Sequence, residues 1–112
     1  MGAIMETNLN TRRPCSDMSL MVDDDSMVDL GIFPNDVVVA NPIARAEDGE
    51  LVIAILNGKT MVRKYFNIDT KICLVPENVN YPTIELNELD DFEIVGVVRK
   101  VINSQIVLSS RA

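Results

Sequence analysis

The sequence contains no histidine and no tryptophan. The lack of histidine excludes Ser-His-Asp and Cys-His chemistry and removes the commonest transition-metal ligand. Any nucleophilic catalysis must therefore use another base. Aromatic residues make up only 4% of the 112 residues and hydrophobic residues 47%, so the core must consist mainly of Val, Ile, Leu and Met. Such β-branched and aliphatic composition favours strands.

Positive charge is also scarce, with 10 basic against 17 acidic residues and a formal net charge of -7. This balance argues against a positively charged surface that would bind the phosphate backbone of nucleic acid, so we expect no direct nucleic-acid binding by this chain. Work near DNA would require a protein partner. No apolar run approaches the roughly 20 residues that cross a bilayer, and no charged and then apolar leader opens the sequence. We therefore expect no membrane association and a cytoplasmic location.

The two cysteines, Cys15 and Cys73, allow at most one disulfide. Cys73 lies in the apolar run 72–75, where a free buried thiol is the commoner state. The acidic run 23–25 resembles the start of a calcium loop, but Met27 occupies a place where that pattern needs an oxygen ligand. We expect no metal and no cofactor.

The length fits a single domain. Residues 1–21 lack helical or strand periodicity and are interpreted as a flexible N-terminal arm or the remainder of a longer chain, followed by one domain over residues 22–112. β-Branched runs separated by turn residues then predict strands, at 37–40, 51–56, 61–66, 71–75 and 92–101. Asn57-Gly58 tolerates the positive φ angles of a tight turn and predicts a hairpin. The expected fold is mostly β, with short antiparallel strands.

Several ordered blocks carry a more specific signal. Ser26-Met27 follows an aspartate and precedes a Gly-Ile turn and an Asp that leads into a hydrophobic strand. Further blocks are 48–54, the hairpin at 57–58, 74–78 with 81–82, and 93–98. Together these blocks resemble the C-terminal domain of the LexA/UmuD family of self-cleaving serine peptidases, over about residues 22–102. The resemblance implies a compact fold of short antiparallel strands and hairpins, and it places the nucleophile at Ser26.

The resemblance also locates the family's general base, a lysine that follows a valine on the strand after the hairpin. Here the run is Val62-Arg63-Lys64, so the lysine position holds Arg63, 37 residues after Ser26. A lysine of pKa ~10.4 can lose about 3–5 units on burial and accept a proton. The neutral fraction of arginine at pH 7 is at most about one in 10⁵, which costs roughly 7 kcal/mol. Lys64 is a possible substitute base, but alternation along a strand turns it away from Ser26 unless a bulge intervenes.

Two other features depart from the family pattern. Asp24 stands where the family usually has glycine, and its carboxylate would disfavour an oxyanion near Ser26. No Ala-Gly or Cys-Gly bond like the family's cleavage site precedes Ser26. The backbone amides around Ser26 and Met27 are the candidate oxyanion donors. Self-cleavage within this chain is therefore not expected to be efficient.

Two functional hypotheses follow from the resemblance. In the favoured one the dyad is broken, and the domain is a homodimeric accessory module that pairs through strands near the C-terminus such as 92–101. Like processed UmuD, it would serve error-prone translesion polymerase together with RecA filaments in the SOS response and DNA repair. The alternative is an active Ser/Lys autoprotease, or the oligomerisation half of a truncated LexA-like or phage-type transcriptional repressor. The basic pair Arg63-Lys64 also fits a plain solvated strand edge.

Overall fold

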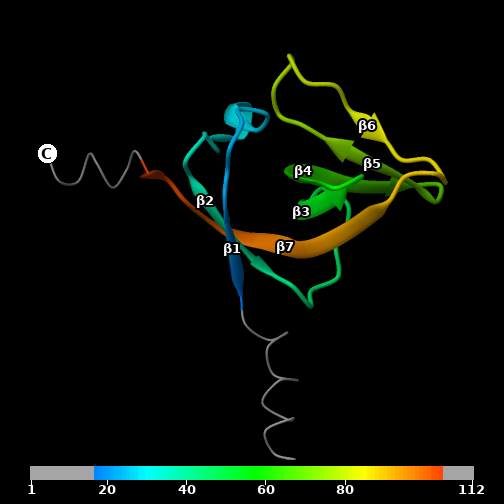
Figure 1. The fold of residues 1–112 in the computed structure, drawn as a ribbon, viewed down its shortest axis with the longest axis horizontal. Helices are drawn as coiled ribbons and strands as arrows, with labels where there is room; N and C mark the ends of the chain where they lie inside the picture. Colours follow the sequence, from blue (N-terminus) through cyan, green and yellow to red (C-terminus); the bar gives the residue numbers. More distant parts are fainter. Residues whose placement is uncertain (1–16, 105–112) are drawn as a thin grey trace, which may run out of the picture.

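The computed structural model describes residues 17–104, which fold into a single curled antiparallel sheet (Figure 1). The predicted fold class, mostly β with short antiparallel strands, is confirmed. The elements in chain order are β1 (Met18–Met21), the 3-10 turn η2 (Val28–Leu30), β2 (Val37–Asn41), β3 (Leu51–Leu56), β4 (Lys59–Ile68), β5 (Lys71–Val75), β6 (Ile84–Glu85) and β7 (Phe92–Ile102). No helix among the described residues is long and apolar enough to span a membrane.

The sheet order is β1-β2-β7-β3-β4-β5-β6, and the long strand β7 joins its two halves. The first part of β7 pairs with β3 up to Val97, and its second part pairs with β2 from Val97 to Ile102. Figure 1 shows β7 running across the molecule from the β3–β6 group to β1 and β2. Register shifts at Val39/Ala40 and Ile53/Ala54 flank Gly96, and such bulges increase local twist. The sheet curls at this place.

The predicted strands at 37–40, 51–56, 61–66, 71–75 and 92–101 are all present, and several extend further. Asn57 (φ 49) and Gly58 (φ 85) form the tight turn of the predicted β3–β4 hairpin. Two strands were not predicted. β1 lies within the segment interpreted as an arm, and its pairing with β2 places residues 18–21 in the sheet; residues 1–16, and Cys15 with them, lie outside the described residues.

Two apolar clusters pack on opposite faces of the β3–β4 hairpin, as strand alternation requires. Ile53 and Val62, which are cross-strand partners, belong to the cluster that the segment after β1 covers. Val52 and Met61 face the other way and pack with residues of β5 and β7. The sheet therefore buries both faces at its centre.

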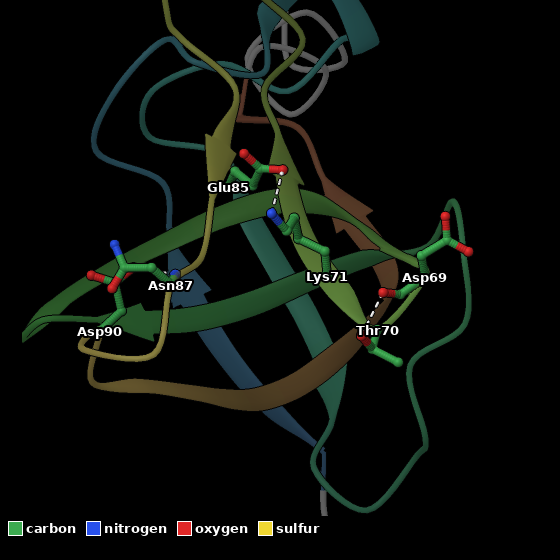
Figure 2. A network of polar contacts seen from close by, with 6 residues as sticks. All are labelled: Asp69, Thr70, Lys71, Glu85, Asn87 and Asp90. Carbon is green, nitrogen blue, oxygen red and sulfur yellow. Dashed lines mark hydrogen bonds and ion pairs between the residues drawn. The ribbon is translucent and has the colours of Figure 1, made fainter.

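At the outer edge of the sheet, Lys71 of β5 and Glu85 of the edge strand β6 are exposed and charged. Lys71 and Glu85 form an ion pair at 3.5 Å across these strands, and Figure 2 shows the two side chains pointing toward each other. Such exposed pairs contribute little to stability. Cys73, on β5, is a free thiol that is half-buried rather than fully buried. A charged edge of this kind discourages pairing with further strands.

Candidate functional site

Ser26 lies in the connection between β1 and β2, which closes back on itself. Val22 N–H donates to Asp36 O and Asn35 N–H donates to Val22 O, both at 2.8 Å. Between these tethers the chain turns through η2, which ends at Gly31 with φ 86. The closed connection holds Ser26 inward, where 1% of its surface is exposed.

The place where Ser26 meets the sheet is set by the early end of β5. β4 pairs with β5 only over Lys64–Ile68, so the preceding residues of β4 have no strand on that side. β5 stops before Pro76, which cannot donate a ladder hydrogen bond. The next residue, Glu77, donates its N–H to Ser26 O at 2.8 Å and accepts from Asp29 N–H at 2.9 Å. These two backbone hydrogen bonds tie the Ser26 segment to the chain just after β5.

Arg63 contacts the Ser26 hydroxyl directly. Its Nη1 donates to Ser26 Oγ at 2.7 Å and to Val62 O at 2.9 Å. The hydroxyl in turn donates to Asp24 Oδ1 at 2.7 Å, and Ser26 N–H donates to the same oxygen at 3.0 Å. Arg63 is 4% exposed. A series of hydrogen bonds therefore runs from the buried guanidinium through the buried hydroxyl to the half-buried carboxylate of Asp24.

The charges of Arg63 and Asp24, at the two ends of this series of hydrogen bonds, stabilise each other. Burial lowers the pKa of Arg63, and the negative charge of Asp24 acts against that shift. Burial by itself would raise the pKa of Asp24, but the Ser26 hydrogen bonds and the charges of Arg63 and Lys59 outweigh it, and the pKa is lowered. Arginine remains protonated under such conditions. At neutral pH the hydroxyl thus lies between a cation and an anion.

Tyr81 covers the outer side of the guanidinium. Its ring centroid lies 5.7 Å from Arg63 Cζ, within cation–π range. Its hydroxyl donates to Asp25 Oδ1 at 2.7 Å, and Asn78 Nδ2 donates to Asp25 O at 2.8 Å. The hydrogen bond to Asp25 raises the pKa of Tyr81. Arg63 Nε is buried and has no partner among the described residues.

Lys64 does not join the site. The ladder between β3 and β4 is continuous, with Arg63 opposite Val52 and Lys64 opposite Leu51 and no bulge between them. Lys64 Nζ instead lies 3.0 Å from Glu77 Oε2. Its ammonium group is therefore engaged on the other face of the strand.

Two further features lie near Ser26: a groove beside Arg63 and the backbone amide of Met27. The groove, of about 440 Å³, begins beside Arg63 and Tyr81 and is lined by Lys59, Met61 and Pro82 among others. Met27 N–H, a predicted oxyanion donor, has no acceptor among residues 17–104. Ser26 N–H, the other candidate, is already bound to Asp24.

Sequence reasoning placed Ser26 and position 63 together, and the structure shows them in contact. It assigned no partner to Asp24 beyond an unfavourable charge, and it missed Tyr81 as the cover of Arg63. The Tyr81-Pro82 pair stood within one of the resembling blocks and was the available signal.

The fold and the site together define a compact β domain built around a buried serine at a strand edge. The family model for S24-like peptidases matches residues 3–99, so the chain belongs to the S24-like peptidase family. It is 37% identical over 100 residues to a LexA repressor of Magnetococcus marinus, covering 89% of this chain and 42% of the repressor. A second LexA repressor, from Pseudomonas putida, is 35% identical over 94 residues, covering 84% of this chain and 46% of the repressor. The chain thus spans less than half the length of these relatives.

Proposed function

We propose that this chain acts in the SOS response as a dimerising, partner-binding domain whose serine site lacks a working base. In this proposal Ser26 stands at the nucleophile position and Arg63 at the position of the general base. The observation that carries the proposal is the 2.7 Å hydrogen bond from Arg63 Nη1 to Ser26 Oγ. A base must accept the hydroxyl proton, whereas this guanidinium donates one.

The arrangement opposes nucleophilic attack in two ways. The guanidinium occupies a lone pair of Ser26 Oγ, and the hydroxyl proton is already directed to Asp24. Asp24 has a lowered pKa and is a weak base. Lys64, the substitute base, is held at Glu77 on the opposite face. No described side chain is thus both near Ser26 and suited to take its proton.

A dimer that pairs through the end of β7 fits the strand order. Beyond Val97, β7 has β2 on one side, while its other side carries no strand among the described residues. Ile102 at the end of this segment is 43% exposed. A strand segment that is unpaired on one side and carries an exposed apolar residue can pair with the same segment of a second copy. The net charge of -7 disfavours direct DNA contact, so a role near DNA would need protein partners. The partners proposed for such a dimer are RecA filaments and an error-prone polymerase.

The second candidate is the oligomerisation half of a LexA-like repressor. It is favoured by the names of the relatives, which are LexA repressors, and by the 42% share of the Magnetococcus marinus protein that the chain covers. In that case the same pairing surface would hold two repressor chains together. DNA binding would then belong to a part of the protein without a counterpart in these 112 residues.

Serine labelling by a fluorophosphonate, read as intact mass between pH 7 and 10, tests the broken site. The chain as given is compared with Arg63→Lys and Ser26→Ala. No adduct on the chain as given supports the proposal. An adduct that disappears in Ser26→Ala contradicts it and shows that another group serves as base.

Sedimentation at micromolar concentration tests the pairing. We expect about twice the 12.4 kDa chain mass. Ile102→Glu should shift the distribution to the monomer because it places a charge at the proposed contact. Ile43→Glu is the matched control, because Ile43 is 59% exposed and lies outside β7. A monomer for the chain as given, or equal effects of the two variants, would contradict the β7 interface.

A further inference from the structure

We propose that Asp24 and Arg63 act as one unit bridged by the Ser26 hydroxyl, and that Asp24 is a positioning residue that locks the serine site independently of which base stands at position 63. The inference rests on the proposed function, a serine site without a working base, and adds a second reason why Ser26 is unreactive. It predicts that restoring a lysine is not enough to restore a reactive serine.

The geometry of Asp24 supports a positioning role. A single oxygen, Oδ1, accepts both the amide and the hydroxyl of Ser26, at 3.0 and 2.7 Å. Two bonds from one residue to the same oxygen fix the side chain of Ser26 as well as its backbone. The hydroxyl proton then points to Asp24, and an oxygen lone pair faces Arg63.

Burial explains why the two residues belong together. An isolated charge with the 4% exposure of Arg63 would be costly, and an opposite charge close by offsets that cost. Arg63 and Asp24 share no direct ion pair within 4 Å among the contacts of the described residues. The Ser26 hydroxyl is therefore the link, and the arginine holds the serine while the serine holds the aspartate.

The Asp24 carboxylate would also change the pKa of a lysine placed at position 63. An adjacent negative charge stabilises the ammonium form and raises its pKa, which is the opposite of what a base near neutral pH requires. The other charged or titratable groups in this region are Asp23 and Asp25 on the Ser26 segment, Lys59 at the start of β4, Tyr81, and the ion pair of Lys64 with Glu77. Tyr81 is bound to Asp25, and Lys59 is exposed, so Asp24 is the group most directly coupled to Ser26.

The test compares Arg63→Lys with Asp24→Asn/Arg63→Lys, each with and without Ser26→Ala. The second-order rate of fluorophosphonate labelling is measured from pH 6 to 11. In Arg63→Lys alone we expect the negative charge of Asp24 to hold the midpoint of the pH profile up against the downward effect of burial at position 63. The added Asp24→Asn should lower the midpoint by about 1–2 units and speed labelling at pH 8 by about 10- to 100-fold. A purely structural role of Asp24 would leave the midpoint unchanged.

The outcomes separate the two proposals. If both lysine variants label with one midpoint, or if neither labels, the lock assigned to Asp24 is overturned while the broken-base proposal stands. If the unmodified chain labels at Ser26, the broken-base proposal fails. If that labelling is lost in Asp24→Asn, Asp24 is itself the base, and the lock fails too.

A stability measurement covers the case in which the labelling variants fold poorly. Asp24→Asn alone leaves Arg63 without its counter-charge, whereas Asp24→Asn/Arg63→Met removes both charges. One coupled unit predicts a lower urea midpoint for Asp24→Asn than for the double variant. A urea midpoint for Asp24→Asn equal to or above that of the double variant would show that Arg63 does not depend on the charge of Asp24, and would overturn the inference.

Discussion

Replacing Asp36 with alanine should be among the most damaging single changes in this domain, although Asp36 touches no proposed reacting atom. Its side chain is fully buried, at 0% exposed. It accepts from Phe33 N–H at 2.8 Å, from Asn103 Nδ2 at 2.6 Å and from Ser104 N–H at 2.9 Å. It thus ties the end of β7 to the connection that carries Ser26.

The magnitude follows from these hydrogen bonds. A hydrogen bond to a charged group contributes about 1.5–3 kcal/mol, and a buried donor left unpaired costs about 1–3 kcal/mol. Asn103 and Ser104 are only half-buried, so water can replace part of their loss. We therefore expect Asp36→Ala to lower the free energy of unfolding by about 3 kcal/mol. For a domain of this size that is a fall in Tm of roughly 12–24 °C.

Thermal unfolding followed by circular dichroism, with urea unfolding as a second method, measures the change. Glu88→Ala is the control, since it removes an exposed carboxylate without a hydrogen bond among the described residues. Asp36→Asn should fall between the two because it keeps an acceptor oxygen and loses the charge. A Tm for Asp36→Ala within about 3 °C of the control would refute the reasoning, because ~0.5 kcal/mol is the ordinary scale of a surface substitution.

Three further changes can be checked in the same assays, together with one pH dependence. Gly96→Ala should lower the free energy of unfolding in urea by about 1–3 kcal/mol, because a Cβ there would lie 3.0 Å from the Cβ of Ala40. Lys64→Ala should lower it by at most about 1 kcal/mol, because it removes a partly exposed ion pair, and should leave serine labelling unchanged. Gly58→Ala should lower the urea midpoint, since its φ of 85 strains any residue with a Cβ. Burial alone would raise the pKa of Asp36, but its hydrogen bonds outweigh burial and the folded-state pKa lies below 3.8. Its contribution is therefore complete above about pH 5, begins to fall near the unfolded value of 3.8 and is lost as pH falls through the folded pKa, so the acid-induced fall in Tm should be shallower in Asp36→Asn.

Local pattern was enough to predict most of the sheet. The five predicted runs of β-branched, aliphatic and aromatic residues became strands, and Asn57-Gly58 became the hairpin turn, because turn chemistry and strand propensity act over a few residues. β1 was missed because it has only four residues, which alternate weakly between half-buried and exposed positions, and because it pairs with β2 across the irregular connection 22–36. β6, with two residues after Pro82, is too short to carry a period.

The site could be predicted only in part. The family resemblance, through the run Val62-Arg63-Lys64, placed position 63 beside Ser26, and strand alternation indicated that Lys64 would face away. The sequence could not predict that Asp24 would accept the serine hydroxyl, because that depends on one side-chain rotamer and on how the segment closes. The Tyr81-Pro82 block marked this loop as part of the resemblance, but not that the Tyr81 ring would cover Arg63, 18 residues earlier in the chain.

The central claim is that Arg63 donates to Ser26 and leaves it without a base. The most direct test is the fluorophosphonate labelling rate of the unmodified chain at pH 8, measured against Ser26→Ala. The account predicts equal rates for the two proteins, at the background level of the reagent. A mass adduct that forms on the unmodified chain and not on Ser26→Ala would contradict it.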